Sequence, residues 1–560
     1  MKKRLNSLTY SFPLLLLFFS VSFGQDQLSE AETRNYDPRT ADLVIQGSIY
    51  ELNGQYEKAL NAFNEAVIFE PNSASISFAV ARNYVLLGKL ETAMQMLKGS
   101  VVAEPNFVDS RRLLATIYHR QGKLELAEEQ YREIVRIDSA NVDALLNLGA
   151  IYESQNKYRE AAQCYETMVA HDLANDEIQF QLGNLYFQMK EYEAAEQAFR
   201  SYIRDFPEQE RGYLAVGALL MAQEDTTGEI AWYEKTYAEN TTFAAVREEL
   251  ASTLVAIRDW DAAVALYERA VSADTTDLIT RIRLGDLYYA KGDTAEAVQM
   301  FEEITDSHPR EWRSYYKLGM IYFSGGDFGE SIRYFEKTAE LNDSLPDAWF
   351  RMGIAYQQEG DLDKAEESYR KAQKLAPLHS WVNFNLGNLL FQKREMEEAI
   401  RFLGKAVAGD PDNSIMLSTL AATYEELQDH EKSEELYLKA LEIEPDNPTI
   451  LNNLGYSLAE RGERLDEALE MVEKALEKEP ENGAFLDTIG WIYFKLSDYE
   501  KALEYITKAI ESRDESAEVM EHLGDVYQKL GQSDLAAEYW QQSRELDPER
   551  ESVLIKLGIN

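Results

Sequence analysis

A period of 34 residues runs through this chain and restricts its fold more than any other feature. Repeats start at residues 40, 74, 108, 142, 176, 210, 244, 278, 312, 346, 380, 414, 448, 483 and 517, and one extra residue lengthens the thirteenth. Self-similarity at such a period is the signature of stacked structural repeats. The sequence therefore predicts one array over residues 40–550, whereas a length of 560 residues alone would suggest three or four globular domains.

Position 8 of the repeat is the most restricted position. It is Gly or Ala in all fifteen repeats, for example Gly47, Ala115 and Gly353. Position 20 is Ala in twelve repeats, position 11 is Tyr in eleven, and position 24 is aromatic in eleven. Small residues let two helices approach closely, and large residues fill the space around them. The pattern predicts close helix contacts within each repeat.

Each repeat reads as two helices. Apolar residues recur at helical spacing over positions 1–14 and again from position 18, with a short turn such as Gly360-Asp361 between them. Position 32 is Pro in nine repeats, as at Pro377, where it ends the second helix. One antiparallel pair cannot bury both of its faces, so neighbouring pairs must stack.

These residues resemble a known family. Trp349 to Tyr356, followed by Gly360, Ala365, Tyr369, Ala372 and Pro377, is similar to the tetratricopeptide repeat. The resemblance implies an all-α, right-handed superhelical solenoid of about 15 helix-turn-helix repeats, with residues 551–560 as a C-terminal capping helix. It also implies that the first helices line a concave groove that binds peptides or partner proteins.

The first 24 residues read as a secretory signal peptide. Lys2, Lys3 and Arg4 precede an apolar run over residues 12–23, and small residues lie before Gln25. The run is too short to span a bilayer, although an uncleaved anchor is the alternative. The only cysteine is Cys164, so no cysteine at the cleavage site could carry a lipid. We expect a linker over residues 25–39 and an exported protein that is periplasmic or secreted, or peripheral to the outer membrane.

Charge and motifs argue against several functions. The chain has 56 basic and 99 acidic residues, and a net charge of -43 would repel nucleic acid. The six histidines lie in different repeats, and no HExxH metal pair, phosphate-binding glycine loop or GxSxG motif occurs. The acidic residues read as a solvated outer face. We therefore expect a non-enzymatic protein without a cofactor or metal.

A basic and aromatic strip in repeats eight to eleven interrupts the acidic character. The resemblance places positions 2, 5, 6, 9, 12 and 13 of each first helix in the groove. The candidate partner-binding residues at these positions are Arg283, Asp286, Tyr289, Arg313, Tyr316, Lys317, Phe323, Phe350, Arg351, Trp381, Phe384, Asn385, Asn388 and Phe391.

The aromatic residues of this strip are not expected to be needed for the core, and Arg and aromatic side chains are common at interfaces. We expect them to bind an extended segment with apolar side chains and some negative charge. The alternative is that they pack between successive first helices or pair with nearby carboxylates.

The last repeats carry a second resemblance. Leu451 to Arg461, Asp487 to Trp491, His522 to Tyr527 and Trp540 resemble the closing repeats of bacterial envelope tetratricopeptide proteins. Some members of that group bring substrates to a processing protease, which implies an envelope protease or an assembly complex as partner. A structural or polysaccharide-handling envelope protein, in which the aromatic strip stacks on sugar rings, is the alternative. The sequence leaves the partner and the oligomeric state open.

Overall fold

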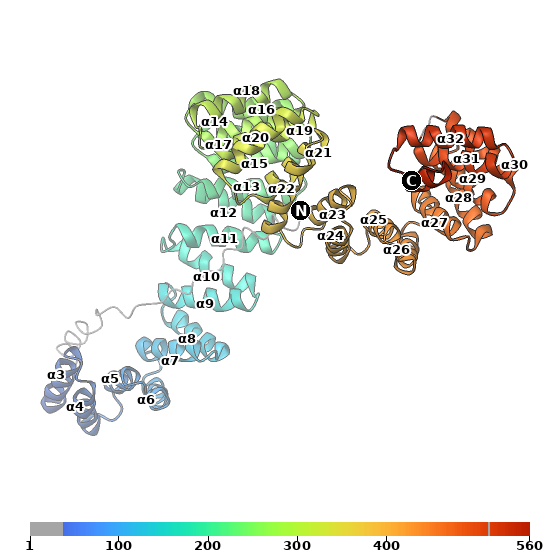
Figure 1. Ribbon diagram of the computed structural model, residues 1–560. Coiled ribbons are helices and arrows are strands. Elements are labelled where there is room, and N and C mark those ends of the chain that lie inside the picture. The colour runs from blue at the N-terminus through green and yellow to red at the C-terminus, as the bar shows by residue number, and fades with distance from the viewer. Residues whose placement is uncertain (1–36, 513–515, 560) are drawn as a thin grey trace. The chain divides into compact units, whose positions relative to one another are not determined.

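The computed structural model of the chain describes residues 37–512 and 516–559. These residues form 31 α-helices, α3 to α33, and no strand occurs among them (Figure 1). The expected signal peptide at residues 1–24 and all but the last residues of the expected linker lie outside the described residues. None of the helices within 37–512 and 516–559 has the length and apolar character needed to cross a membrane.

The helices follow one another with short connections. The first fourteen are α3 (Pro38–Leu52), α4 (Tyr56–Phe69), α5 (Ala74–Leu86), α6 (Leu90–Ala103), α7 (Val108–Arg120), α8 (Leu124–Ile137), α9 (Val142–Ser154), α10 (Tyr158–Ala170), α11 (Asp176–Gln188), α12 (Tyr192–Asp205), α13 (Glu210–Ala222), α14 (Thr226–Glu239), α15 (Ala244–Ala256) and α16 (Trp260–Ala273). The next nine are α17 (Leu278–Lys291), α18 (Thr294–Ser307), α19 (Trp312–Ser324), α20 (Phe328–Leu341), α21 (Pro346–Gln358), α22 (Leu362–Leu375), α23 (Ser380–Gln392), α24 (Met396–Gly409) and α25 (Ser414–Glu426). The last eight are α26 (His430–Ile443), α27 (Pro448–Arg461), α28 (Leu465–Lys478), α29 (Gly483–Lys495), α30 (Tyr499–Glu511), α31 (Ala517–Lys529), α32 (Ser533–Leu546) and α33 (Glu551–Lys556).

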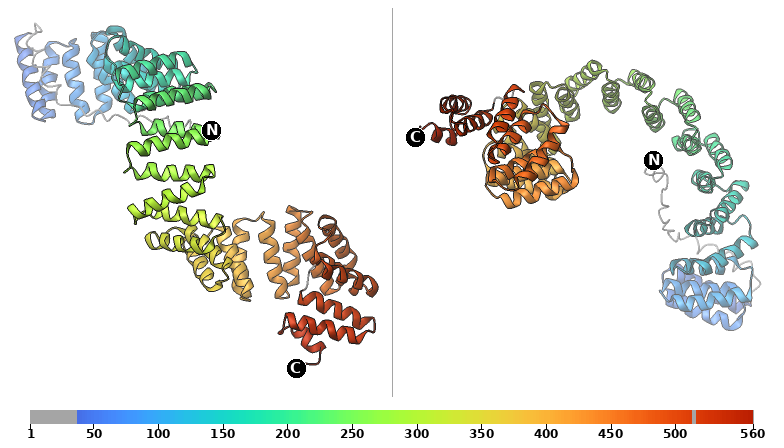
Figure 2. Two further views of the ribbon diagram at one scale, coloured as in Figure 1. Left: turned by 90° about the horizontal axis from the view of Figure 1, so that it is seen from above. Right: turned by 90° about the vertical axis from the view of Figure 1, so that its right-hand side faces the viewer.

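Consecutive helices form antiparallel pairs that stack on their neighbours. Most first helices pack most extensively against the second helix of their own repeat, and the second helix then packs against the next pair (Figure 2). This arrangement confirms the predicted all-α solenoid of about 15 helix-turn-helix repeats. Two compact units can be distinguished, unit 1 ending at Leu266 and unit 2 beginning at Tyr267, and the division falls inside α16.

A left-handed backbone residue ends every first helix. Position 15 has a positive φ in all fifteen repeats, as at Gly360 with φ 82° and Arg394 with φ 64°. In this conformation the chain leaves the helix and reverses direction. Glycine occupies eight of these positions, and seven repeats use another residue, although a side chain in this conformation costs about 1 kcal/mol.

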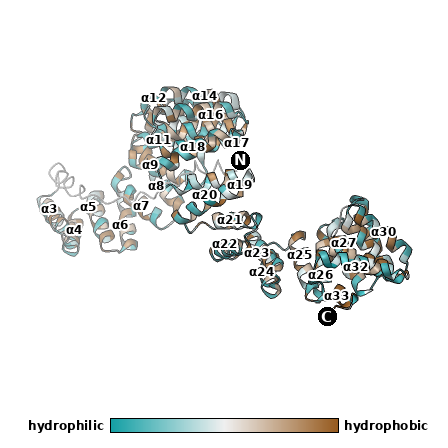
Figure 3. Ribbon diagram, turned by 45° about the horizontal axis from the view of Figure 1, so that its top comes forward, coloured by the Kyte–Doolittle hydropathy of each residue, from teal (hydrophilic) through white to brown (hydrophobic). Residues whose placement is uncertain are grey.

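The small residue at position 8 faces the large residue at position 24 of the same repeat. A Cβ atom on Gly353 would lie 2.5 Å from a ring carbon of Tyr369, and one on Gly183 would lie 2.4 Å from Phe199. Tyr369 and Phe199 are buried. The predicted close approach is confirmed in the eleven repeats that have glycine at position 8. Figure 3 shows the resulting amphipathic helices, in which apolar and polar residues share one helix.

The core is a series of local clusters along each unit. One cluster in unit 2, here called the repeat-ten cluster, joins buried residues of α20 to α24, among them Phe335, Met352, Tyr369 and Leu386. Because each repeat packs mainly on the repeats next to it, stability depends on nearest-neighbour contacts.

Candidate protein-interaction face

The predicted partner-binding residues lie on α17, α19, α21 and α23, the first helices of repeats eight to eleven in unit 2. Successive first helices contact one another directly, as α19 contacts α21 and α23 contacts α25. Second helices of successive repeats have no comparable contact among the described residues. The first helices therefore crowd together along one side of the unit. We call the surface formed by their positions 2, 5, 6, 9, 12 and 13 the first-helix face.

Three of the predicted cations on this face already have carboxylate partners. Lys317 Nζ lies 2.6 Å from Asp286 Oδ1 on the preceding first helix. Arg351 Nε donates to Asp347 Oδ2 at 2.8 Å, and Arg313 Nη1 donates to Glu311 Oε1 at 3.2 Å. These pairs are partly exposed, so each contributes about 1 kcal/mol or less to stability. They offset the positive charge that the sequence suggested for the face.

The carboxylate of Asp347 links α19 to α21. It accepts hydrogen bonds from the hydroxyl of Tyr316 on α19 and from Arg351 on its own helix. The Arg351 guanidinium also lies 5.9 Å from the centre of the Phe323 ring. Burial and the bond to Asp347 raise the pKa of Tyr316 to about 12. Burial opposes the charge of Arg351, but the bond to Asp347 outweighs it and raises the pKa of Arg351.

Most of the predicted aromatic residues contribute to packing. Tyr316, Phe323, Phe350 and Phe391 pack against the repeat-ten cluster, and the Phe350 ring lies 6.1 Å from the ring of Tyr369. The expectation that the core does not need these side chains is wrong, because successive first helices approach closely enough to pack them between repeats. Tyr289 is 39% exposed, and Arg283 is exposed as well.

Exposed apolar side chains of the face lie in repeat eight, where Ile279 is 70% exposed, and in repeats eleven and twelve. Trp381 is 43% exposed, and its ring meets Phe384 edge-on with centroids 5.5 Å apart. Asn388 is exposed, whereas the Asn385 amide donates to the Trp381 carbonyl at 2.8 Å. Ile415 occupies the same repeat position as Trp381 on the next first helix and is 53% exposed. Leu378, in the turn before Trp381, is 90% exposed.

Sequence reasoning missed three residues of this region. Asp347 and Ile415 both occupy position 2, a groove position, but a search for basic and aromatic residues passes over an aspartate and an isoleucine. Leu378 follows Pro377 in the turn between repeats, and no repeat pattern marks it as exposed. Their position in the 34-residue repeat would have been enough to identify Asp347 and Ile415 as groove residues.

A second group of residues on the first-helix face links the last three repeats. His522 of α31 is 4% exposed, and its Nδ1 lies 2.9 Å from Asp487 Oδ2 of α29. The His522 ring stacks on Trp491 at 4.0 Å. Tyr456 of α27 donates to Glu518 Oε1 of α31 at 2.5 Å, across two repeats. These residues lie outside repeats eight to eleven, and the sequence indicated them only through the resemblance to envelope proteins.

The electrostatics of the second group favour a charged histidine. Burial lowers the pKa of His522, but Asp487, Glu518 and Glu460 together raise it above the ordinary value. At the end of the array, Lys556 of α33 lies 2.7 Å from Glu521 Oε1 and 2.6 Å from Asp525 Oδ2. The side chains of this second group therefore contact one another. Within the described ranges, no three His, Cys, Asp or Glu side chains are arranged to hold a metal ion.

Family comparisons agree with the repeat pattern. The model of the C-terminal domain of cilia and flagella-associated protein 70 matches residues 238–484. The model of the C-terminal ARM domain of tetratricopeptide repeat protein 21 matches residues 49–211. A tetratricopeptide repeat model matches residues 180–245, 452–518 and 488–551. No curated protein matches the chain at a significant level.

Solved structures with a similar course include a complex of Naa15 and Naa10 bound to HypK-THB. It is 15% identical, with a TM-score of 0.40, and the match covers 93% of this chain and 96% of that one. A tetratricopeptide repeat protein from Parabacteroides merdae is 16% identical, with a TM-score of 0.40, over 44% of this chain and 97% of that one. MamA is 28% identical, with a TM-score of 0.28, over 29% of this chain and 95% of that one.

The family models thus match segments from residue 49 to residue 551. They coincide with the 34-residue period and with the stacked helix pairs. This chain belongs to the tetratricopeptide repeat family.

Proposed function

We propose that this protein is an exported, non-enzymatic scaffold that holds a polypeptide partner on the first-helix face of unit 2. Tetratricopeptide arrays typically serve protein–protein interaction, which supports the general role. The observation that carries the proposal is the exposure of Trp381, at 43%, on a face whose other large aromatic side chains are mostly packed. An exposed tryptophan beside apolar neighbours is the kind of residue that dominates binding energy at interfaces.

The chemistry of the exposed region indicates which segment it would bind. Trp381, Leu378 and Ile415 offer apolar surface, and the Asn388 amide can donate to and accept from a peptide backbone. Lys317 and Arg351 are paired with Asp286 and Asp347, so they contribute little free positive charge. The proposed partner segment is therefore extended, mainly apolar and largely uncharged, with less negative charge than the sequence alone suggested.

The proposed location is the cell envelope or its exterior. It rests on the signal-like residues 1–24 and on the resemblance of the last repeats to envelope adaptors. We propose residues 25–39 as a linker, residues 40–550 as the repeat array and residues 551–560 as its cap. A processing protease or an assembly complex of the envelope is the proposed kind of partner.

The test compares partner capture by the exported protein and by its variants. The bait is crosslinked in its native host and purified, and its mature N-terminus is expected at Gln25. Trp381→Ala, or Leu378→Ser with Ile415→Ser, should weaken capture of the specific partner by about 30-fold or more, the effect of losing a hot spot worth about 2 kcal/mol. Ile68→Ser and Val102→Ser, which change residues 75% and 81% exposed in unit 1, are the matched controls.

The outcomes separate the two candidate roles. A protein retained by the wild type and the controls but lost by both groups of face variants supports the proposal. An unchanged set of captured proteins in the Trp381→Ala variant, with its helical content intact, would overturn it. Binding to a polysaccharide array that disappears with Trp381→Ala, without any captured protein, would favour the polysaccharide-handling role instead.

A further inference from the structure

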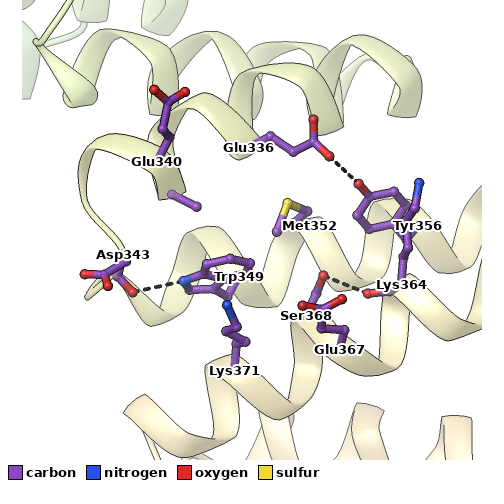
Figure 4. A pocket seen from close by; sticks show the side chains of 11 residues that line it. Glu336, Glu340, Asp343, Trp349, Met352, Tyr356, Lys364, Glu367, Ser368 and Lys371 are labelled. Atoms are coloured by element: carbon purple, nitrogen blue, oxygen red, sulfur yellow. Dashed lines mark hydrogen bonds between the residues drawn. The ribbon is translucent and has the colours of Figure 1, made fainter.

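An open crevice of about 440 Å³ lies between α20, α21 and α22 in unit 2. Its floor is formed by Trp349, Met352 and Tyr356 of α21, as Figure 4 shows. These residues occupy positions 4, 7 and 11 of the tenth repeat, none of which belongs to the first-helix face. The crevice is thus a separate surface that the proposed function does not use.

The rim of this crevice is predominantly acidic. Glu336, Glu340 and Asp343 come from α20 and the turn after it, and Glu367 comes from α22. All four side chains are exposed. Two lysines, Lys364 and Lys371, also line the crevice, and Lys337 pairs with Glu340 at 2.7 Å, so the four carboxylates still outnumber the three nearby lysines. Both lysines belong to α22 on one wall, whereas three of the carboxylates lie along the opposite wall (Figure 4).

The aromatic floor already holds cations. Lys371 Nζ lies 4.5 Å from the centre of the Trp349 ring, and Lys364 Nζ lies 5.1 Å from that of Tyr356. Trp349 is held by a hydrogen bond from its Nε1 to the Asp343 carbonyl at 3.0 Å, and Tyr356 by one from its hydroxyl to Glu336 Oε1 at 2.6 Å. Two fixed rings beneath a rim of carboxylates form a site that favours a cation, because ring faces and carboxylates both carry negative charge density.

The same crevice recurs in unit 1 with the opposite charge. A crevice of about 590 Å³ lies between α8, α9 and α10, and its floor is Leu145, Leu148 and Tyr152, again at positions 4, 7 and 11. Its charged residues are Arg132, Arg136 and Lys157 against Glu128 and Glu160. The repeat therefore determines the shape of the crevice, whereas the local sequence determines its charge and its floor. Leu145 stands where the acidic crevice has Trp349.

We propose that the crevice of repeats nine and ten is a second docking site, which takes an arginine or lysine side chain of a partner polypeptide. The incoming cation would lie against the Trp349 ring in place of Lys371, within reach of the rim carboxylates. Arginine suits such a site better than lysine, because its planar guanidinium stacks on a ring and is less strongly hydrated. The crevice in unit 1 has the wrong charge for the same ligand.

The first experiment measures binding of a fluorescein-labelled peptide in which arginine alternates with glycine and serine. The titrated protein is the full mature chain, and the readout is fluorescence anisotropy. Glu340→Gln, Asp343→Asn and Glu367→Gln together should weaken binding about tenfold, and Trp349→Leu, which copies the floor of the unit 1 crevice, should weaken it several-fold. A peptide with glutamate in place of arginine should not bind.

The matched control separates the crevice from the general negative charge of the chain. Glu470→Gln, Glu473→Gln and Glu477→Gln remove the same charge from exposed positions of α28, and they should change binding less than twofold. Equal weakening by both triple variants would overturn the proposal, since the peptide would then respond to the diffuse field only.

The second experiment locates the bound peptide. An arginine peptide that carries benzoylphenylalanine next to a single arginine should crosslink to Met352 or to another residue of α21 on irradiation. Crosslinks spread over α28 or the first-helix face would count against the crevice. Trp381→Ala should leave this crosslink unchanged, so failure of the first-helix face and failure of the crevice can be told apart.

Discussion

A glycine at position 8 matters in this protein because of the side chain that it faces. Gly353 lies against the ring of Tyr369, whose hydroxyl donates to Gln357 at 2.9 Å. The ring is buried and held at its far end, so it has little room to move away. The eleven glycines at position 8 therefore mark close contacts between the two helices of a repeat, and an aromatic residue at position 24 forms most of these contacts.

Replacing Gly353 by Val should lower the free energy of unfolding by about 1–3 kcal/mol, the usual cost of overpacking a core. The measurement is the shift of the urea midpoint, together with hydrogen exchange of α21 and α22. Gly404→Val in α24 is the control, because a Cβ atom there meets no atom within 4 Å. It should be neutral or slightly stabilising, since valine forms helix better than glycine. Equal destabilisation by the two variants would contradict the proposed role of the ring.

The sequence predicts the small and large positions well because a fixed period repeats the same contact. It raises pairing with nearby carboxylates as an alternative, but it does not identify Asp347 as the partner of Arg351 and Tyr316, because that depends on the distance between successive first helices. It also does not predict how exceptions are accommodated. Glu229 replaces alanine at position 20, and it is only 4% exposed. There its carboxylate accepts a hydrogen bond from the Thr253 hydroxyl at 3.0 Å.

At the scale of elements, a few successive first helices are joined by nearly buried ion pairs, such as Arg82 with Glu51 between α5 and α3. The contact between α29 and α31 is one of these. Here the buried pair of His522 and Asp487 joins them, with Trp491 stacked on the histidine. A buried ion pair contributes to stability only when hydrogen bonds and close partners compensate the loss of water. The protonation state of His522 should therefore govern how tightly the last repeats are held.

We expect the stability of the last repeats to fall as the pH rises above about 6.5, the ordinary pKa of histidine. The folded-state pKa of His522 is raised, so its contribution is complete below the unfolded-state value of about 6.5 and is lost as the pH passes the folded-state value. His522→Gln should cost about 1–3 kcal/mol at pH 6, since it leaves the buried Asp487 without its charged partner, and it should remove most of the pH dependence. Hydrogen exchange of α29 and α31 measures both effects.

The control for this prediction is His119→Gln, which changes an exposed histidine of α7 in unit 1. Its exchange rates in α29 and α31 should follow those of the wild type at every pH. Protection of these two helices that rises with pH, or that changes equally in both variants, would disprove the proposed role of His522.

The turns and the first-helix face show which features of the helices can be predicted from the sequence. The sequence predicts a short turn between the two helices, and the structure shows that its residue at position 15 is left-handed in all fifteen repeats, with glycine in eight and another residue, such as Arg394, in seven. The register likewise brings Trp381 and Ile415 to one face. It cannot tell which groove residues are packed: Phe350 at position 5 packs against the repeat-ten cluster, whereas Trp381 at position 2 is 43% exposed, although both are groove positions. The exposed part of the candidate site therefore required the structure.

At the scale of the whole molecule, both compact units are built from the same type of repeat, but the charges that line their crevices differ. The acidic crevice belongs to unit 2 and the basic crevice to unit 1. A scaffold built in this way can present different charges from one fold, because each repeat keeps its core positions while its outer positions vary. Most of the acidic excess, 99 acidic against 56 basic residues, lies on such outer positions.

This net charge of -43 should make stability depend on salt. Carboxylates repel one another over a Debye length of about 30 Å at 0.01 M salt and about 8 Å at 0.15 M. The urea midpoint should therefore rise when sodium chloride is increased from 0.01 to 0.15 M, and it should level off by about 1 M, where the screening length is about 3 Å. The ion pairs, Lys317 with Asp286 for example, weaken over the same range but contribute little individually. A midpoint that falls with salt would mean that these pairs outweigh the repulsion, whereas a rise that continues through several molar would indicate adaptation to high salt.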